Sequence, residues 1–296
     1  MPFLGEISAL LTAVCWSGSS IAFAAATNAI GSVQVNISRL VFATIFLFVT
    51  ILVAGMNISL SSLQVFYLVI SGFIGLVFGD TYLFKSYQEI GPRLSMLIMS
   101  TAPAISTVLA YFFLSEVLSL WGIAGIFVTI AGIVLVVLER PDASSKKYTI
   151  SKIGLVYGFL GALGQGVGLI FAKLAFHEGA INGFVATFVR VASSMAVYLP
   201  LGFLTRRYIN PVKIFSHRKK TLVFTLIGAI LGPYFGITFS LIAVANTKVG
   251  IAAALMATVP ILMLPLVRYI YKESLSWKAV AGACIAVAGV AILFLR

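Results

Sequence analysis

The sequence is poor in charge, cysteine and histidine. Only 9% of its 296 residues are charged and 61% are hydrophobic, whereas about 25% of the residues of a soluble domain are charged. Such a chain cannot cover itself with polar surface in water, which excludes an ordinary cytosolic enzyme, a disordered tail and a small secreted scaffold. The two cysteines, Cys15 and Cys284, lie inside apolar runs near opposite ends of the chain, so no disulfide framework is available.

Side chains suited to catalysis or metal binding are scarce as well. The two histidines, His177 and His217, lie in predicted loops, and no H-E-x-x-H sequence occurs. The eight acidic residues are scattered along the chain and cannot build a two-metal site. We therefore predict that the protein is not an enzyme and that it has no cofactor or metal site.

Long apolar runs make up most of the chain. A membrane helix needs about 20 mostly apolar residues to cross about 30 Å of hydrocarbon. Runs such as 134–138 and 286–295 do not alternate as barrel strands do, so we predict an all-α integral membrane protein with ten transmembrane helices. The first run lacks a basic start and a cleavage site, so we expect it to be retained. The predicted spans are residues 4–26, 33–55, 63–84, 94–114, 119–138, 151–173, 182–204, 221–244, 250–270 and 277–295.

The two halves of the sequence match each other. Four pairs of identical residues lie 157 positions apart: Pro103 and Pro260, Glu116 and Glu273, Gly125 and Gly282, Gly132 and Gly289. Earlier in the chain, residues 75–80 match 228–233 at an offset of 153, and Arg39 matches Arg190 at 151. We predict two five-helix repeats, residues 1–138 and 151–296, joined by a connecting loop at 139–150. Because five is odd, the second repeat is inverted, and such architectures place a substrate site between the repeats.

Ten spans in two copies, each ending in Pro-x12-Glu-x8-Gly-x6-Gly, resemble the EamA-type transporters of the drug/metabolite transporter superfamily. The resemblance covers essentially the whole chain. It implies a central cavity surrounded by spans one to four and six to nine, with spans five and ten at the periphery. It also implies export or exchange of small metabolites such as amino acids, without a metal or prosthetic group.

Buried charges and this architecture together predict the function. We predict a secondary-active carrier, an exporter or exchanger of a small polar metabolite such as an amino acid or an organic anion, working by alternating access. Arg39 and Arg190 are the deepest cations, which favours a zwitterionic or anionic substrate. The alternative is a passive channel, although a channel normally uses a ring of like groups from symmetric subunits.

The net charge of +12 is explained by where the basic residues lie relative to the membrane, and not by nucleic-acid binding. Sixteen of the 20 basic residues lie at one predicted face and four at the other. Because basic residues usually stay cytoplasmic, this bias favours outward termini, whereas the family resemblance implies cytoplasmic termini. We expect anionic lipids at the basic face, a plasma-membrane location, a monomer or homodimer, and no nucleic-acid partner.

Asp80 and Arg39 are the first candidates for a functional site. Asp80 lies about four residues inside the end of the third predicted span, and Arg39 lies at a similar depth in the second. A charged side chain at the centre of a membrane helix costs about 2.5–3.5 kcal/mol to insert, and an Asp80–Arg39 pair would lower this cost. Such a pair either only joins two helices or forms a gate or substrate contact.

Further polar or aromatic side chains occur at membrane depth. Arg190 is too deep to reach water with ease and needs backbone carbonyls or a substrate anion. Gln165 is bracketed by glycines, and its counterpart Trp16 begins a small polar run; both suit either binding or helix packing. Tyr234 follows a helix-kinking proline. The predicted substrate-binding residues are Trp16, Ser20, Asn36, Arg39, Asp80, Gln165, Arg190 and Tyr234.

Two kinds of residue are predicted to be structural. Glu116 and Glu273 each lie in a short turn before the next helix, where a carboxylate accepts hydrogen bonds from exposed helix N–H groups. Pro103, Pro260 and Pro265 are predicted to bend their helices because proline removes a backbone donor.

Overall fold

The computed structural model describes residues 3–113, 120–137, 150–246, 252, 255–271 and 276–294, and the regular structure within these ranges is helical. Six helices are long and apolar enough to cross a membrane: Leu4–Ile30, Ser32–Val53, Ser62–Met99, Lys152–His177, Gly183–Leu204 and Lys219–Asn246. Three shorter apolar helices cover Leu120–Val136, Val259–Ile270 and Trp277–Ile292. The predicted Glu116 and Glu273 turns, and nearly all of the predicted loop at 139–150, lie outside the described residues.

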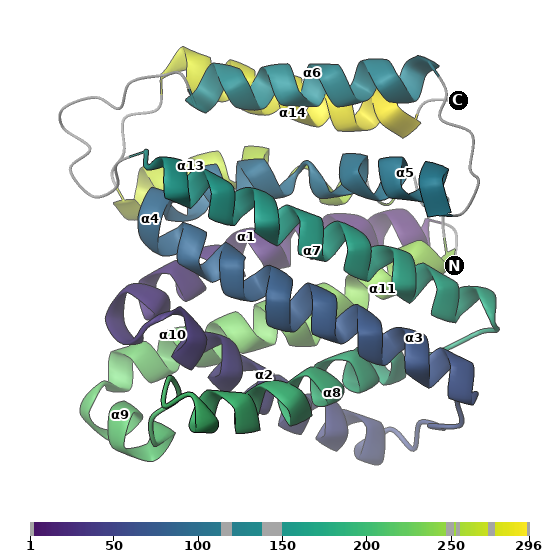
Figure 1. The fold of residues 1–296 in the computed structure, drawn as a ribbon, viewed down its shortest axis with the longest axis vertical. Coiled ribbons are helices and arrows are strands. Elements are labelled where there is room, and N and C mark those ends of the chain that lie inside the picture. Colours follow the sequence, from purple (N-terminus) through teal and green to yellow (C-terminus); the bar gives the residue numbers. More distant parts are fainter. Residues whose placement is uncertain are drawn as a thin grey trace.

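The helices follow one another in a similar order in the two halves of the chain (Figure 1). The first half contains α1 (Leu4–Ile30), α2 (Ser32–Val53), α3 (Ser62–Gly72), the π-helical η1 (Phe73–Gly79), α4 (Asp80–Met99), α5 (Ala102–Phe113) and α6 (Leu120–Val137). The second half contains α7 (Lys152–His177), α8 (Gly183–Leu204), α9 (Pro211–His217), α10 (Lys219–Ala229), the π-helical η2 (Ile230–Gly236), α11 (Ile237–Asn246), α13 (Val259–Tyr271) and α14 (Trp277–Phe294).

The helix that contains the third predicted span continues beyond that span, and this changes the position of Asp80 within the helix. The helix of α3, η1 and α4 continues past residue 84 to Gly91, whose backbone is non-helical (φ 78°) and precedes Pro92. The ammonium group of Lys85, in the part of the helix beyond Asp80, lies 4.9 Å from the centroid of the Tyr82 ring, within the range of cation–π attraction. Asp80 is therefore well inside the helix and not about four residues from its end.

The two π-helical segments give the register between the halves. η1 begins at Phe73 and η2 at Ile230, an offset of 157, and in each the residue after the segment donates its N–H five residues back, to Gly75 or Gly232. The predicted offset of 153 for this region differs by about one helical turn. Glycines recur every fourth residue in η2 and before it, so the sequence pattern matches almost equally well in both registers.

Both halves also contain a helix break before a proline. α4 ends at Met99 and α5 begins at Ala102, while α13 begins at Val259 after a turn at residues 257–258. The hydroxyls of Thr101 and Thr258 donate to the carbonyls of Ile98 and Leu255, again at an offset of 157. Pro103 and Pro260 follow in the first turn of the next helix, where a missing N–H costs least. The predicted bends are thus complete breaks, whereas Pro265 lies inside α13.

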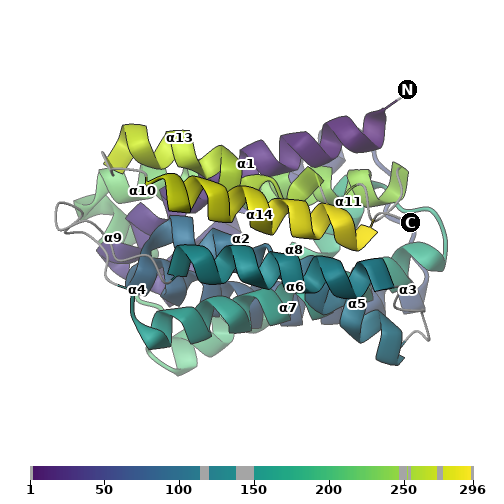
Figure 2. The same cartoon turned by 90° about the horizontal axis from the view of Figure 1, so that it is seen from above.

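The first helix of each half packs against the third helical rod of the other half. α1 contacts α10, η2 and α11, while α7 contacts α3, η1 and α4, and α2 packs along α8. Close approach explains the glycines of α7, since a Cβ on Gly164 would lie 2.6 Å from the Cα of Gly79. α6 and α14 pair at one edge of the bundle (Figures 1 and 2), where a Cβ on Gly132 would lie 2.4 Å from the backbone nitrogen of Ala286.

The two described ends of the chain lie at the same end of the bundle. The start of α1 and the end of α14 are on one side, and the short helix α9 is on the opposite side (Figures 1 and 2). The sequence did not predict α9; Asn210 caps it by accepting hydrogen bonds from the N–H groups of Val212 and Lys213. This helix belongs to the basic segment between α8 and α10, so part of the predicted basic face lies opposite the described ends.

Candidate functional site

A cavity of about 160 Å³ lies at the centre of the bundle, between elements of both halves. Its lining comes from α1, α2, η1, α4 and α5 of the first half and from α7, α8, η2, α11 and α13 of the second. Among the described residues none of α6 or α14 lines it, in agreement with the expectation that the fifth and tenth predicted spans are peripheral. The polar side chains that line it are Ser19, Arg39, Asp80, Tyr87, Ser100, Gln165, Arg190 and Ser240.

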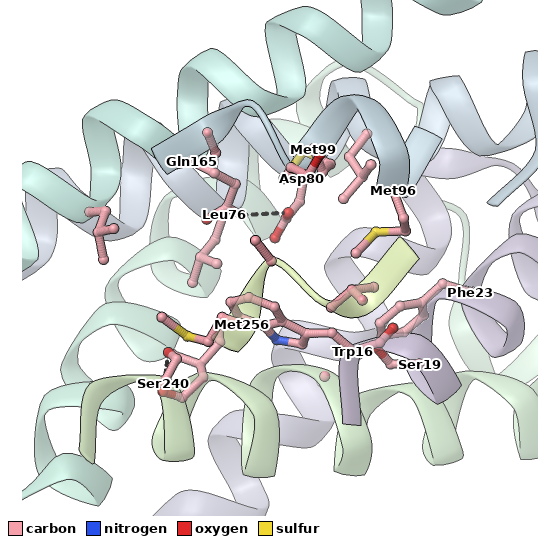
Figure 3. A pocket seen from close by; sticks show the side chains of 18 of the residues that line it. Trp16, Ser19, Phe23, Leu76, Asp80, Met96, Met99, Gln165, Ser240 and Met256 are labelled. Carbon is pink, nitrogen blue, oxygen red and sulfur yellow. Dashed lines mark hydrogen bonds between the residues drawn. The ribbon is translucent and has the colours of Figure 1, made fainter. Parts of the chain in front are cut away.

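Arg39 and Asp80 form a buried ion pair at one side of this cavity. Arg39 Nη2 contacts Asp80 Oδ2, and only 5% and 6% of the two side chains are exposed. Gln165 Nε2 donates to the other carboxylate oxygen, Oδ1, at 2.8 Å. Figure 3 shows Gln165 and Asp80 on one side of the cavity, with Trp16 across from them. Both oxygens of the carboxylate are thus occupied, and the predicted pair is confirmed.

The π-helical turn η1 provides a further partner for this pair. The N–H of Asp80 donates to Gly75 O, five residues back, instead of Leu76 O. The carbonyl of Leu76 is then available to accept from Asn36 Nδ2 at 3.1 Å. Asn36 Oδ1 in turn accepts from Arg39 Nε at 2.8 Å. The irregular backbone therefore holds the amide that orients the arginine.

Two aromatic rings complete the environment of Arg39. Its Cζ lies 5.4 Å from the centroid of the Phe23 ring and 4.9 Å from that of Phe84. Both distances are within the range of cation–π attraction, which favours the charged guanidinium in a buried site. Arg39 is thereby held by an anion, an amide and two rings.

Arg190 lines the same cavity without such partners. The residue is 4% exposed, and its Nε is the one buried side-chain nitrogen or oxygen without a hydrogen-bond partner among the described residues. A Cβ placed on Gly75 would lie 3.4 Å from Arg190 Nη2 and 3.6 Å from Gln165 Oε1. The guanidinium and the amide therefore approach the same small space beside Gly75.

Three predicted residues lie outside the cavity lining. Ser20 donates to Ser17 O at 2.8 Å and contacts Met263 Sδ at 3.3 Å. The hydroxyl of Tyr234 is 2.7 Å from Thr50 Oγ1 of α2. Asn36 acts through Arg39, as described above. Of the predicted set, the cavity brings together Trp16, Arg39, Asp80, Gln165 and Arg190.

Several lining residues were missed from the sequence. Ser19 and Phe23 follow Trp16 by three and seven positions, so helical periodicity would have placed them on the same face of α1. Ser100 lies in the break before Pro103, where the matched prolines were a usable signal. The remaining missed polar and methionine residues are Tyr87, Met96, Met99, Ser240 and Met256.

Comparison with known proteins gives one family and one fold. The model of the EamA-like transporter family matches residues 3–138 and again residues 152–295. A solved structure, described only as a crystal structure of a protein, superposes with a TM-score of 0.69 at 16% identity over 97% of this chain and 95% of that chain. At this identity the likeness shows the fold alone. The comparison with curated proteins gives no match.

Proposed function

The chain belongs to the EamA-like transporter family, part of the drug/metabolite transporter superfamily, and on this premise we propose that it is a secondary-active carrier of a small polar metabolite. Members of this family are membrane transporters and not enzymes, and the apolar helices make the chain an integral multi-pass membrane protein. The proposed substrate is an amino acid or an organic anion, exported or exchanged across the plasma membrane by alternating access.

One observation carries this proposal: the cavity lies between the two halves and contains buried charged side chains. Arg39 and Asp80 come from the first half, whereas Gln165 and Arg190 come from the second. Charged side chains at membrane depth are costly and usually mark a substrate or ion pathway. The cavity has room for a small molecule, since an apolar cavity of about 150 Å³ in another protein holds benzene.

The alternating movement is proposed to use matched irregularities on either side of the cavity. The π-helical segments η1 and η2 and the breaks before Pro103 and Pro260 recur at an offset of 157. Short or broken helices at corresponding positions of two halves are typical of carriers built from inverted repeats. We propose that residues 1–138 and 151–296 are such repeats, of five helices each, which reorient about these points.

A hydrogen bond that joins the two halves beside the cavity must then be remade during transport. The bond from Gln165 Nε2 to Asp80 Oδ1 joins α7 of the second half to α4 of the first. The Arg39–Asp80 pair joins α2 to α4 within the first half. The Arg39–Asp80 pair therefore moves as a unit in this proposal, whereas the Gln165–Asp80 bond breaks or forms as the halves move relative to each other.

Counterflow in proteoliposomes tests the proposal. Vesicles containing the purified protein are loaded with unlabelled leucine or 4-methyl-2-oxopentanoate and given the corresponding labelled compound outside, with a wider panel of amino acids and carboxylates in parallel. We expect saturable uptake that the internal solute accelerates. Flux that neither saturates nor responds to the internal solute would indicate a channel, and absence of flux across the panel would contradict the proposal.

We also propose a lipid partner for the basic segment around α9. Lys213, Arg218 and Lys219 are exposed there, beside the exposed apolar side chain of Val212. Cations next to an apolar side chain suit the headgroup region of a membrane containing anionic lipids. The protein is proposed to work there as a monomer or homodimer.

A further inference from the structure

The charged groups that line the cavity do not balance. Arg39 is paired with Asp80, whose second oxygen accepts from Gln165. Arg190 has an unpartnered Nε, and Asp80 is the one acidic residue among the described residues of the lining. The lining of the cavity therefore holds one positive charge in excess, on Arg190.

A ligand with a single negative charge would remove this excess. A buried charge is unfavourable unless it is paired, and a guanidinium pairs best with a planar oxyanion such as a carboxylate. The helices α5 and α13 add to the preference, since both begin at cavity-lining residues, Ala102 and Val259. The positive end of a helix dipole favours an anion nearby.

The same cavity does not offer a place for an ammonium group. The carboxylate of Asp80 already accepts from Arg39 and Gln165, so its charge is neutralised within the protein. An added ammonium would also lie in a small cavity with two guanidinium groups, which repel it. A zwitterion would thus leave the excess charge of the cavity unchanged.

The rest of the lining is suited to an apolar body. Trp16, Phe23, Met96, Met99 and Met256 line the cavity, and serine hydroxyls are the main neutral polar groups besides Gln165. Figure 3 shows Met99 and Met96 on the side of Asp80, with Trp16 and Phe23 facing them. Flexible thioethers and rings bind alkyl or aryl groups of varied shape.

We propose that the substrate site takes a monocarboxylate with an apolar body and no ammonium group, whose carboxylate pairs with Arg190. This inference rests on the proposed carrier function and narrows it from polar metabolites in general to one charge class. A simple branched-chain carboxylate and a 2-oxo acid share the required chemistry, and the experiment below separates them.

The protein contains its own reporter for this test. Trp16 lines the cavity, while Trp121 and Trp277 are exposed on α6 and α14, which contribute no described lining residue. A Trp121→Phe/Trp277→Phe variant leaves Trp16 as the single tryptophan. Its fluorescence in detergent then reports binding without requiring transport.

Four compounds with nearly the same branched body separate the charge classes: 4-methylpentanoate, 4-methyl-2-oxopentanoate, leucine and 3-methylbutylamine. We expect saturable changes in Trp16 emission with one or both carboxylates. The carboxylate that binds more tightly shows whether the site prefers a simple carboxylate or a 2-oxo acid. Leucine should bind about tenfold more weakly or worse, because its ammonium is repelled, and the amine should not bind. Leucine or the amine binding as tightly as the carboxylates would overturn the proposal.

Variants of Arg190 in the single-tryptophan background test the residue itself. Arg190→Gln should weaken binding of the carboxylate by about tenfold or more, because a charge-assisted pair is lost. Arg190→Lys should weaken it less, since the charge remains. Lys278→Gln is the matched control, because it removes an exposed charge on α14, outside the cavity lining, and should leave affinity unchanged.

The possible failures are distinguishable. If Arg190→Gln binds 4-methylpentanoate and 4-methyl-2-oxopentanoate as the parent does, the assignment of Arg190 is wrong; if the variant does not fold, the four-compound series on the parent still decides the charge class. Counterflow of leucine without counterflow of either carboxylate would support the carrier function and contradict the proposed specificity for monocarboxylates. Carboxylate binding that depends on Arg190, without any counterflow, would support the proposed binding site and contradict the carrier function.

Discussion

Arg39 and Arg190 occupy matching positions in the two halves, yet only Arg39 is neutralised. They lie on α2 and α8, whose first residues are separated by the same 151 positions as the arginines themselves. Arg39 has an amide three residues earlier, Asn36, an acid, Asp80, and through that acid the amide of Gln165. At the positions that match these three residues, Arg190 has, in the same order, Thr187, Ile237 and Trp16.

The scaffold around the two arginines is otherwise alike. Thr81 Oγ1 donates to Val77 O and accepts from Asn36, while Thr238 Oγ1 donates to Tyr234 O and lies 3.3 Å from Thr187 Oγ1. The differences are thus concentrated in the groups that would face the guanidinium. The first half therefore contains a neutralised ion pair, Arg39–Asp80. The second half contains a cation, Arg190, that needs a partner from outside the chain.

The largest effect should come from making Arg39 resemble Arg190. In Asp80→Asn, Arg39 loses its counter-charge while it stays buried, and removal of one partner of a buried pair costs about 3–5 kcal/mol. We expect a large fall in the midpoint of thermal unfolding in detergent. The double variant Arg39→Gln/Asp80→Asn should recover much of the loss, because neither charge remains. Equal losses in the single and double variants would show that the two residues do not act as a pair.

This pair also shows what the sequence could and could not predict. Long apolar runs and two isolated opposite charges predicted buried helices and the Arg39–Asp80 pair, because lipid leaves a charged side chain few alternatives. The position of Asp80 within its helix was not predicted, because the apolar run ends at residue 84 whereas the helix continues to Gly91, with Lys85 beside two tyrosine rings.

The orientation of Tyr234 could not be predicted for a different reason. It lies within η2, where a π-helical turn adds one residue and rotates the side chains relative to an α-helix. Its hydroxyl consequently meets Thr50 on α2 rather than the cavity. A sequence pattern with glycine at every fourth position gives no sign of this extra residue, so the α-helical expectation fails where the backbone departs from it.

A second variant should make Arg190 resemble Arg39. Ile237 lines the cavity at the position that matches Asp80, so Ile237→Asp offers Arg190 an internal carboxylate. That carboxylate competes with an external one, and we expect 4-methylpentanoate to bind about tenfold more weakly or worse. Trp16 fluorescence measures the change, and Ile237→Asn, which has the same shape without the charge, serves as the control. Equal binding by the aspartate and asparagine variants would mean that position 237 does not reach Arg190.

The smallest expected effect is on stability, in Arg190→Gln, and it distinguishes the unpaired Arg190 from the paired Arg39. Arg190→Gln removes a buried cation whose Nε makes no hydrogen bond and which forms no salt bridge among the described residues. We expect unfolding free energy to stay within about 1 kcal/mol of the parent or to rise, since an uncompensated buried charge is itself unfavourable. Arg39→Gln, by contrast, leaves Asp80 buried without its cation and should unfold at a clearly lower temperature. Thermal unfolding of the two variants side by side measures this difference. If Arg190→Gln proved as unstable as Arg39→Gln, Arg190 would have a structural partner in the empty protein, and the cavity would not carry the excess charge that selects an anion.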